Sequence, residues 1–161
     1  MTPPFRVLVL CTGNSARSQI GEALLQTRGA TRAAGRVTAL SAGSRPASRV
    51  NPYAEETLVG HGIPWAGRTP KSIDDVAGEA FDLVITVCDN AHEACPYFPG
   101  ARAQVHWGLP DPAEEKAPAA ARHAFAATFD ALSRRVDALL ALPLESLDAD
   151  ALRAAAQAVH A

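Results

Sequence analysis

Short runs of apolar and β-branched residues alternate along this chain with longer segments in which apolar positions recur every three or four residues. The short runs are typical of strands buried on both faces of a parallel sheet, and the longer pattern is typical of amphipathic helices. The runs predict strands at 5–10, 37–42, 83–87 and 104–107, with 83–87 as a central strand. The periodic segments predict helices at 15–28, 52–61, 72–80, 119–142 and from about 148 almost to the end.

This alternation predicts an α/β fold with a three-layer, doubly wound, four-stranded parallel sheet. In such sheets ligands bind beyond the carboxyl ends of the strands. Cys11, Cys88 and the segment 107–111 lie at the ends of predicted strands, so we expect all of them at this edge. We expect one domain over 1–161, in which 144–161 is a loosely packed helical extension at the C-terminus.

The composition fits a single compact domain. The chain has 161 residues, of which 48% are hydrophobic, enough for a continuous core. Its formal net charge of -2 lacks the basic excess that nonspecific nucleic-acid binding requires. No apolar stretch approaches the roughly 18 residues of a membrane span, and the N-terminus does not resemble a signal peptide. We therefore expect a cytoplasmic monomer without nucleic-acid or membrane contacts, whose three cysteines are reduced or reactive.

The segment CTGNSARS, between the first strand and the first helix, has the features of an anion-binding loop. Five residues separate Cys11 from Arg17, and their main-chain amides can curl around one tetrahedral anion at the start of the helix. The guanidinium of Arg17 can bind two oxygens of that anion at once. The expected oxyanion-binding residues are Thr12, Gly13, Asn14, Ser15, Ala16, Arg17 and Ser18.

Cys11 is the candidate nucleophile of this loop. A helix N-terminus and a nearby arginine both favour the thiolate over the thiol. Ser18 can donate its hydroxyl to the sulfur, and Asn14 is the residue we expect in a left-handed conformation. A lone cysteine at a strand end is more commonly a small buried hydrophobe. The combination of cysteine, arginine and a polar strand-to-helix turn favours the catalytic interpretation.

CTGNSARSQ, together with Asp111-Pro112 downstream, resembles the low-molecular-weight protein tyrosine phosphatases. The chain is more similar still to the arsenate reductases built on that fold. This resemblance runs from about Phe5 to Ala113 and is weak beyond Phe129. It includes the segments Ser41-Ala42-Gly43, Asn51-Pro52 and His106-Trp107-Gly108, and the pair Cys88 and Cys95.

The resemblance implies reduction of arsenate to arsenite by a three-cysteine cascade, a step in arsenic detoxification. Cys11 attacks arsenate, Cys88 attacks Cys11, and Cys95 attacks Cys88, while Asp111 protonates the leaving group. An external thiol reductant then reduces the last disulfide; thioredoxin is expected, and glutaredoxin with glutathione is the second choice. No cofactor and no metal ion is expected.

Spacing adds a condition to this scheme. In a helix, Cys88 and Cys95 would lie about 10 Å apart, whereas a disulfide tolerates no more than roughly 7 Å between Cα atoms. Bridging them requires that the segment loop out or rearrange. A metal site formed by Cys88, His92 and Cys95 is disfavoured, because their spacing does not match a standard zinc motif.

Some reductases of this kind bind a potassium ion behind the loop, at positions that match Asn14, Glu22 and Ser41. This chain departs from them at Lys71, where those members have an acidic residue. We hypothesise that the ammonium of Lys71 takes the place of the cation and bonds to Glu22. The other interpretation of Lys71 is a solvated surface lysine.

Two alternative functions remain open. A tyrosine phosphatase acting through a phosphocysteine needs only Cys11, Arg17 and Asp111. A thiol redox sensor without turnover would form the disulfide between Cys88 and Cys95 without needing arsenate. Trp107 and Tyr97 are candidates for a pocket wall, and His106 is expected to be structural.

Overall fold

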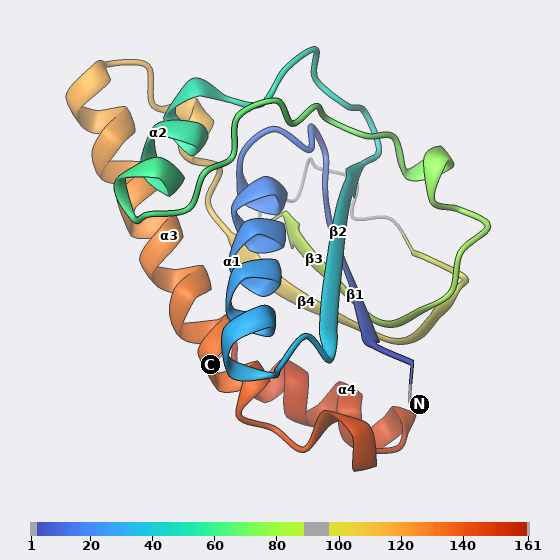
Figure 1. Ribbon diagram of the computed structural model, residues 1–161. Coiled ribbons are helices and arrows are strands. Elements are labelled where there is room, and N and C mark those ends of the chain that lie inside the picture. Colours follow the sequence, from blue (N-terminus) through green and yellow to red (C-terminus); the bar gives the residue numbers. More distant parts are fainter. Residues whose placement is uncertain (1–2, 89–96, 161) are drawn as a thin grey trace.

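The computed structural model describes residues 3–88 and 97–160. Four parallel strands form one sheet in the order β2-β1-β3-β4 (Figure 1). The strands are β1 (Phe5–Cys11), β2 (Val37–Gly43), β3 (Phe81–Cys88) and β4 (Ala101–Leu109). Each of the four predicted runs is thus a strand, and 83–87 lies in one of the two inner strands, as predicted.

Four α-helices accompany the sheet in the described part of the chain (Figure 1). They are α1 (Arg17–Arg32), α2 (Pro52–Gly60), α3 (Pro118–Leu140) and α4 (Ala149–Ala158). All four helices contribute to the larger apolar cluster, which packs on one face of the sheet. A smaller cluster on the other face includes Leu8, Leu10, Val84 and Phe98. The parallel α/β prediction is therefore confirmed.

Two predicted helix boundaries are wrong, for different reasons. Residues 72–80 form only a short 3-10 helix, Ile73–Asp75, which Ser72 and Asp75 start with a capping box but which does not continue as an α-helix. Helix α1 continues to Arg32, past residue 28, where it was predicted to end. A Cβ at Gly29 would lie 2.8 Å from the carbonyl oxygen of Val37, so glycine is needed there for close packing against β2.

The C-terminal helix is well packed, so the expectation of a loose extension is wrong. Leu152 and Ala156 on α4 are fully buried. The indole nitrogen of Trp107 donates a hydrogen bond to the carbonyl oxygen of Ala156, at 2.9 Å. The side chain of Gln157 binds both the N–H and the carbonyl oxygen of His106, at 2.9 and 2.7 Å. Helix α4 is thereby fixed along β4, at the edge of the sheet.

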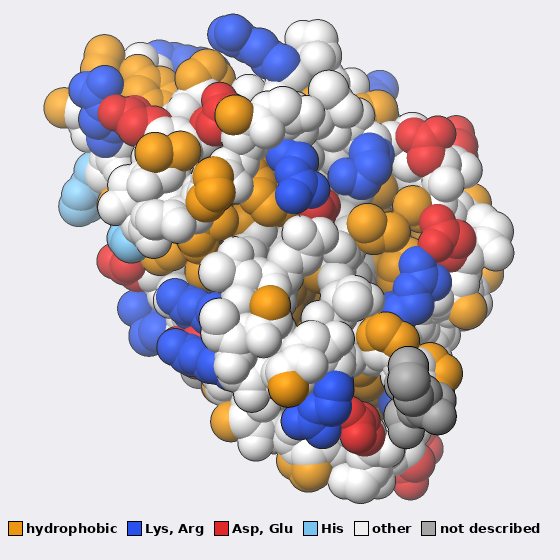
Figure 2. All heavy atoms as spheres, in the orientation of Figure 1, with side chains coloured by type: hydrophobic (Ala, Val, Ile, Leu, Met, Phe, Trp, Pro, Cys, Tyr) orange, Lys and Arg blue, Asp and Glu red, His pale blue; other side chains and the backbone are white. Residues whose placement is uncertain are grey.

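Within residues 3–88 and 97–160, no helix is long and apolar enough to cross a membrane. On the face shown in Figure 2, basic side chains are spread among acidic and apolar ones rather than gathered in one patch. This distribution agrees with the absence of a basic excess in the composition.

Candidate active site

Cys11 lies at the base of a pocket where β1 passes into α1. The pocket has a volume of about 270 Å³, and its lining residues are Cys11, Thr12, Gly13, Ser15, Ala16, Arg17, Asp111 and Ala113. Cys11 is a free thiol. Ala16, at the N-cap of α1, has no side chain that could cap the helix, and the first turn carries no acidic residue. The first amides of α1 are therefore suited to an anion in this pocket.

Among the residues that the structure describes, Ser18 and Asn14 hydrogen-bond to the sulfur of Cys11. The hydroxyl oxygen of Ser18 lies 2.8 Å from Sγ, and the main-chain N–H of Asn14 donates to Sγ at 3.3 Å. Because the oxygen of Ser18 already accepts a hydrogen bond from Asn14 Nδ2, its own proton can point to the sulfur. Both contacts stabilise a negative charge on Cys11.

Asn14 holds the loop in shape. Its φ of 48° lies in the left-handed region, as predicted, and its side chain is fully buried. Its Nδ2 donates to the hydroxyl oxygens of Ser18 and Ser41, both at 2.8 Å. Its Oδ1 accepts from the main-chain N–H of Lys71 at 2.8 Å and from Gln19 Nε2 at 3.1 Å. This carboxamide thus uses both donors and both acceptor sites inside the protein.

Arg17 connects the loop to the ends of two other strands. Its Nη1 donates to the carbonyl oxygens of Leu109 and Val87, at 2.9 and 3.4 Å. Only 3% of the residue is exposed, and it lines the pocket of Cys11. The guanidinium is therefore held at the carboxyl edge of the sheet rather than in bulk solvent, as an anion-binding role requires.

Asp111 faces this guanidinium across the pocket. Its Oδ2 lies 3.9 Å from Nη2 of Arg17, and its side chain is about one-third exposed. Its Oδ1 accepts from the N–H of Ala113 at 3.0 Å and caps the short 3-10 helix Pro112–Glu114. The carboxyl group is thus fixed by its own turn and borders the space that an anion above Cys11 would occupy.

Cys88 ends the strand next to that of Cys11. Strands β1 and β3 pair in parallel with Leu10 opposite Thr86, so both cysteines lie at the same edge of the sheet. The pairing of β3 with β4 shifts register between Thr86 and Cys88. Cys88 is buried and disulfide-bonded, whereas Cys11 is free. Cys95 and His92, the other residues considered with Cys88, lie outside the described residues.

Behind the loop, a buried carboxylate is paired with two cations. Glu22 is only 1% exposed and accepts a hydrogen bond of 2.5 Å from the hydroxyl of Ser41. The ammonium of Lys71 lies 3.5 Å from its Oε1, and Nη1 of Arg68 lies 3.4 Å from its Oε2. The predicted contact between Lys71 and Glu22 is present. Arg68 was not predicted, because nothing local in the sequence links it to Glu22.

The segment after β2 forms the outer side of the loop. The amides of Ser44, Arg45 and Ala47 donate to the carbonyl oxygens of residues 11, 12 and 13, at 3.3, 2.9 and 2.9 Å. Gly43 permits this approach, because a Cβ there would lie 2.4 Å from the carbonyl oxygen of Thr12. The loop is therefore supported on two sides by segments distant in sequence.

Three aromatic or histidine side chains considered in the sequence are not among the described residues that line the pocket. Trp107 is buried against α4, so it does not form a pocket wall. Tyr97 is 79% exposed. His106 Nδ1 lies 2.8 Å from the hydroxyl of Thr86, which supports its structural interpretation.

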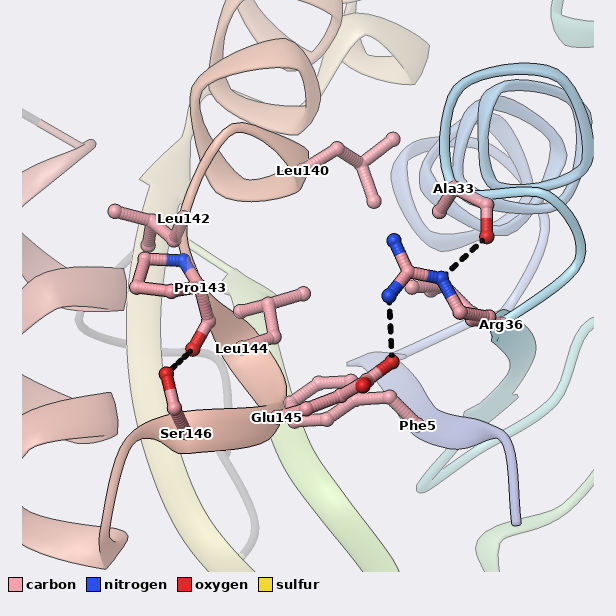
Figure 3. Close-up of a pocket in the computed structure, with 10 residues that line it drawn as sticks. Phe5, Ala33, Arg36, Leu140, Leu142, Pro143, Leu144, Glu145 and Ser146 are labelled. Atoms are coloured by element: carbon pink, nitrogen blue, oxygen red, sulfur yellow. Dashed lines mark hydrogen bonds and ion pairs between the residues drawn. The ribbon is translucent and has the colours of Figure 1, made fainter. Parts of the chain in front are cut away.

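A second pocket of about 280 Å³ lies between the ends of α1 and α3 (Figure 3). It is lined mainly by apolar side chains, including Phe5, Leu140 and Leu144. Its charged residues, Arg36 and Glu145, pair with each other at 3.1 Å. We assign it no chemistry.

Comparisons with known proteins agree with this geometry. The chain matches the model of the low molecular weight phosphotyrosine protein phosphatase family over residues 6–153, well beyond Phe129. An arsenate reductase of Halalkalibacterium halodurans is 37% identical over 108 residues, which cover 67% of this chain and 74% of the relative.

Two solved structures have the same fold. One is an arsenate reductase in the phosphate binding state, with a TM-score of 0.70 and 27% identity, covering 84% of this chain and 96% of the other. The second is a thioredoxin-dependent arsenate reductase of Corynebacterium glutamicum, with a TM-score of 0.57 and 30% identity. It covers 84% of this chain and 63% of the other.

Proposed function

The chain belongs to the low molecular weight phosphotyrosine protein phosphatase family, and from this premise we propose that it reduces arsenate to arsenite in the cytoplasm. The observation that carries the proposal is a pair of cysteines at the ends of neighbouring parallel strands. Cys11 lies in an anion pocket at the end of β1, and Cys88 ends β3 at the same edge of the sheet. A phosphatase needs the first cysteine but has no use for the second.

In the first step, arsenate binds in the loop with its oxygens on the main-chain amides and on Arg17. The thiolate of Cys11 attacks arsenic and forms a sulfur–arsenic bond. One arsenic–oxygen bond breaks, and Asp111 supplies the proton that lets this oxygen leave as water. Asp111 faces the guanidinium that holds the anion, at 3.9 Å, so it is placed to do this.

In the second step, the thiolate of Cys88 attacks the sulfur of Cys11. The sulfur–arsenic bond breaks, and its electron pair stays on arsenic, which leaves as arsenite. The two sulfurs are oxidised to a disulfide as arsenic is reduced. Since the two cysteines end adjacent parallel strands, which lie roughly 4.8 Å apart, this attack needs only a local movement of the end of β3.

In the third step, Cys95 attacks Cys88 and frees Cys11 as a thiolate. An external dithiol then reduces the disulfide between Cys88 and Cys95. We propose thioredoxin for this role, with glutaredoxin and glutathione as the second choice. The proposal is supported by the thioredoxin-dependent relative at 30% identity.

The pocket favours a small inorganic oxyanion over phosphotyrosine. Its lining, in the part of the chain that the structure describes, contains no aromatic side chain. These described residues therefore offer an aromatic ester no ring-to-ring contact of the kind that usually holds a phenyl group in a pocket. The same loop can still hold phosphate, so slow hydrolysis of phosphate monoesters is compatible with the proposal.

The test is a thiol count after a single turnover with arsenate and no reductant. The reduced wild type should lose two thiols, and Cys11→Ser should lose none. Cys95→Ser should stop with Cys11 bonded to Cys88, and Cys88→Ser should release no arsenite. Efficient hydrolysis of p-nitrophenyl phosphate without arsenate-dependent thiol loss would favour the phosphatase instead. Thiol loss without arsenate would favour a redox sensor.

A further inference from the structure

A buried tryptophan, Trp65, which does not line the pocket, is linked to Asn14 through one glutamine. The indole Nε1 of Trp65 donates to Oε1 of Gln19 at 2.8 Å. Nε2 of Gln19 then donates to Asn14 twice, to its main-chain oxygen at 3.0 Å and to its Oδ1 at 3.1 Å. Gln19 is 1% exposed and Trp65 is 3% exposed, so water cannot easily replace these bonds.

Gln19 restricts the conformation of Asn14, on which the shape of the loop depends. A single donor group binds both the carbonyl oxygen and the side chain of Asn14, which restricts its ψ and its side-chain torsions together. Asn14 has a positive φ, a conformation that carries a cost for any residue except glycine. Its N–H donates to Sγ of Cys11, so a change in its orientation moves a contact of the nucleophile.

The tryptophan fixes the orientation of the glutamine. A carboxamide can rotate by half a turn, which here would place its oxygen against two acceptors of Asn14. An indole N–H can only donate, so Trp65 holds Oε1 on its own side and Nε2 toward the loop. The guanidinium of Arg68 lies over the indole ring, 3.9 Å from its centroid, and pairs with Glu22. The ring is therefore itself held in place.

We propose that Trp65 and Gln19 are positioning residues for Cys11, which act by fixing the left-handed conformation of Asn14. Trp65 does not line the pocket, so it cannot contact the anion. The proposal rests on the role of Cys11 as the nucleophile. Its test uses the reactivity of the Cys11 thiol itself, which can be measured whether or not the protein reduces arsenate.

The test compares two conservative substitutions, Trp65→Phe and Trp107→Phe. Each removes one buried indole hydrogen bond and keeps an aromatic ring. Trp107 binds Ala156 on α4, so it serves as the matched control. The rate of alkylation of Cys11 by iodoacetamide is measured across pH, with the labelled peptide quantified by mass spectrometry.

We expect the midpoint of the alkylation profile to move upward by about one pH unit in Trp65→Phe. The charged lining residues, Arg17 and Asp111, are the same in both variants. The midpoint in Trp107→Phe should equal that of the wild type. Gln19→Met, which removes the intermediate carboxamide, should shift the midpoint at least as far as Trp65→Phe.

The same variants separate a positioning role from a merely structural one. Trp65→Phe should lower kcat/KM for arsenate by about tenfold, while its melting temperature falls no further than that of Trp107→Phe. Equal alkylation midpoints in the wild type, Trp65→Phe and Gln19→Met would overturn the proposal. If Trp65→Phe does not fold, the alkylation midpoint of Gln19→Met decides whether the proposal holds.

Discussion

The ammonium of Lys71 lies 3.5 Å from Oε1 of Glu22, directly behind the anion-binding loop. With Arg68 on the other carboxylate oxygen, two positive charges already face this single buried negative charge. A further monovalent cation would meet net repulsion there.

We therefore predict that potassium does not activate this protein. Arsenate-dependent thiol oxidation should change by less than about twofold when potassium replaces sodium at constant ionic strength. Lys71→Asp, which introduces an acidic residue, should become sensitive to potassium. A strong activation of the wild type by potassium would show that Lys71 does not replace the ion.

Arg17→Lys should lose oxyanion binding although the positive charge is retained. The guanidinium has enough donors to bind the carbonyl oxygen of Leu109 and an anion together. A lysine ammonium carries all its donors on one nitrogen atom and cannot bind two oxygens of the anion in a fixed fork. Phosphate bound in the loop should protect Cys11 from alkylation. In Arg17→Lys, we expect the same protection to need on the order of 100-fold more phosphate than in the wild type. Arg153→Lys, on an exposed arginine of α4 paired with Asp150, is the control and should behave as the wild type.

Asp111→Asn should slow formation of the arsenic adduct without unfolding the turn. Asparagine still accepts the hydrogen bond from Ala113 but cannot supply the proton. Rapid-mixing measurements of the first step should show a loss of roughly 100-fold or more. Asp148→Asn alters a similar capping aspartate at α4 and should leave the rate unchanged. An unchanged rate in Asp111→Asn would remove Asp111 from the mechanism.

Gly43→Ala should destabilise the protein by more than a change in helix or strand propensity can explain. The added Cβ would meet the carbonyl oxygen of Thr12 at 2.4 Å, so one of the two segments must move. We expect a loss of about 1–3 kcal/mol in the free energy of unfolding, together with weaker phosphate binding. Gly60→Ala, where a Cβ would meet nothing within 4 Å, is the control and should cost nothing. Equal urea midpoints for the two variants would contradict this interpretation.

Features encoded locally were predictable from the sequence. The four strands and the left-handed Asn14 follow from residue type and short-range pattern. The false helix at 72–80 shows the limit of such patterns, because a capping box starts a turn but cannot extend it. The contacts of Trp65 with Gln19 and of Arg68 with Glu22 each join residues 46 positions apart, so no local pattern indicated them.

The bond between Gln157 and the main chain of His106 has a consequence beyond holding α4. Strand β4 is the outermost strand on its side of the sheet, and an unpaired outer strand can recruit an extended segment from another molecule. The glutamine side chain occupies one N–H and one carbonyl oxygen of that strand, where a foreign strand would have to bind. A chain truncated before α4 would thus be prone to aggregation through added strands, even with an intact reaction pocket.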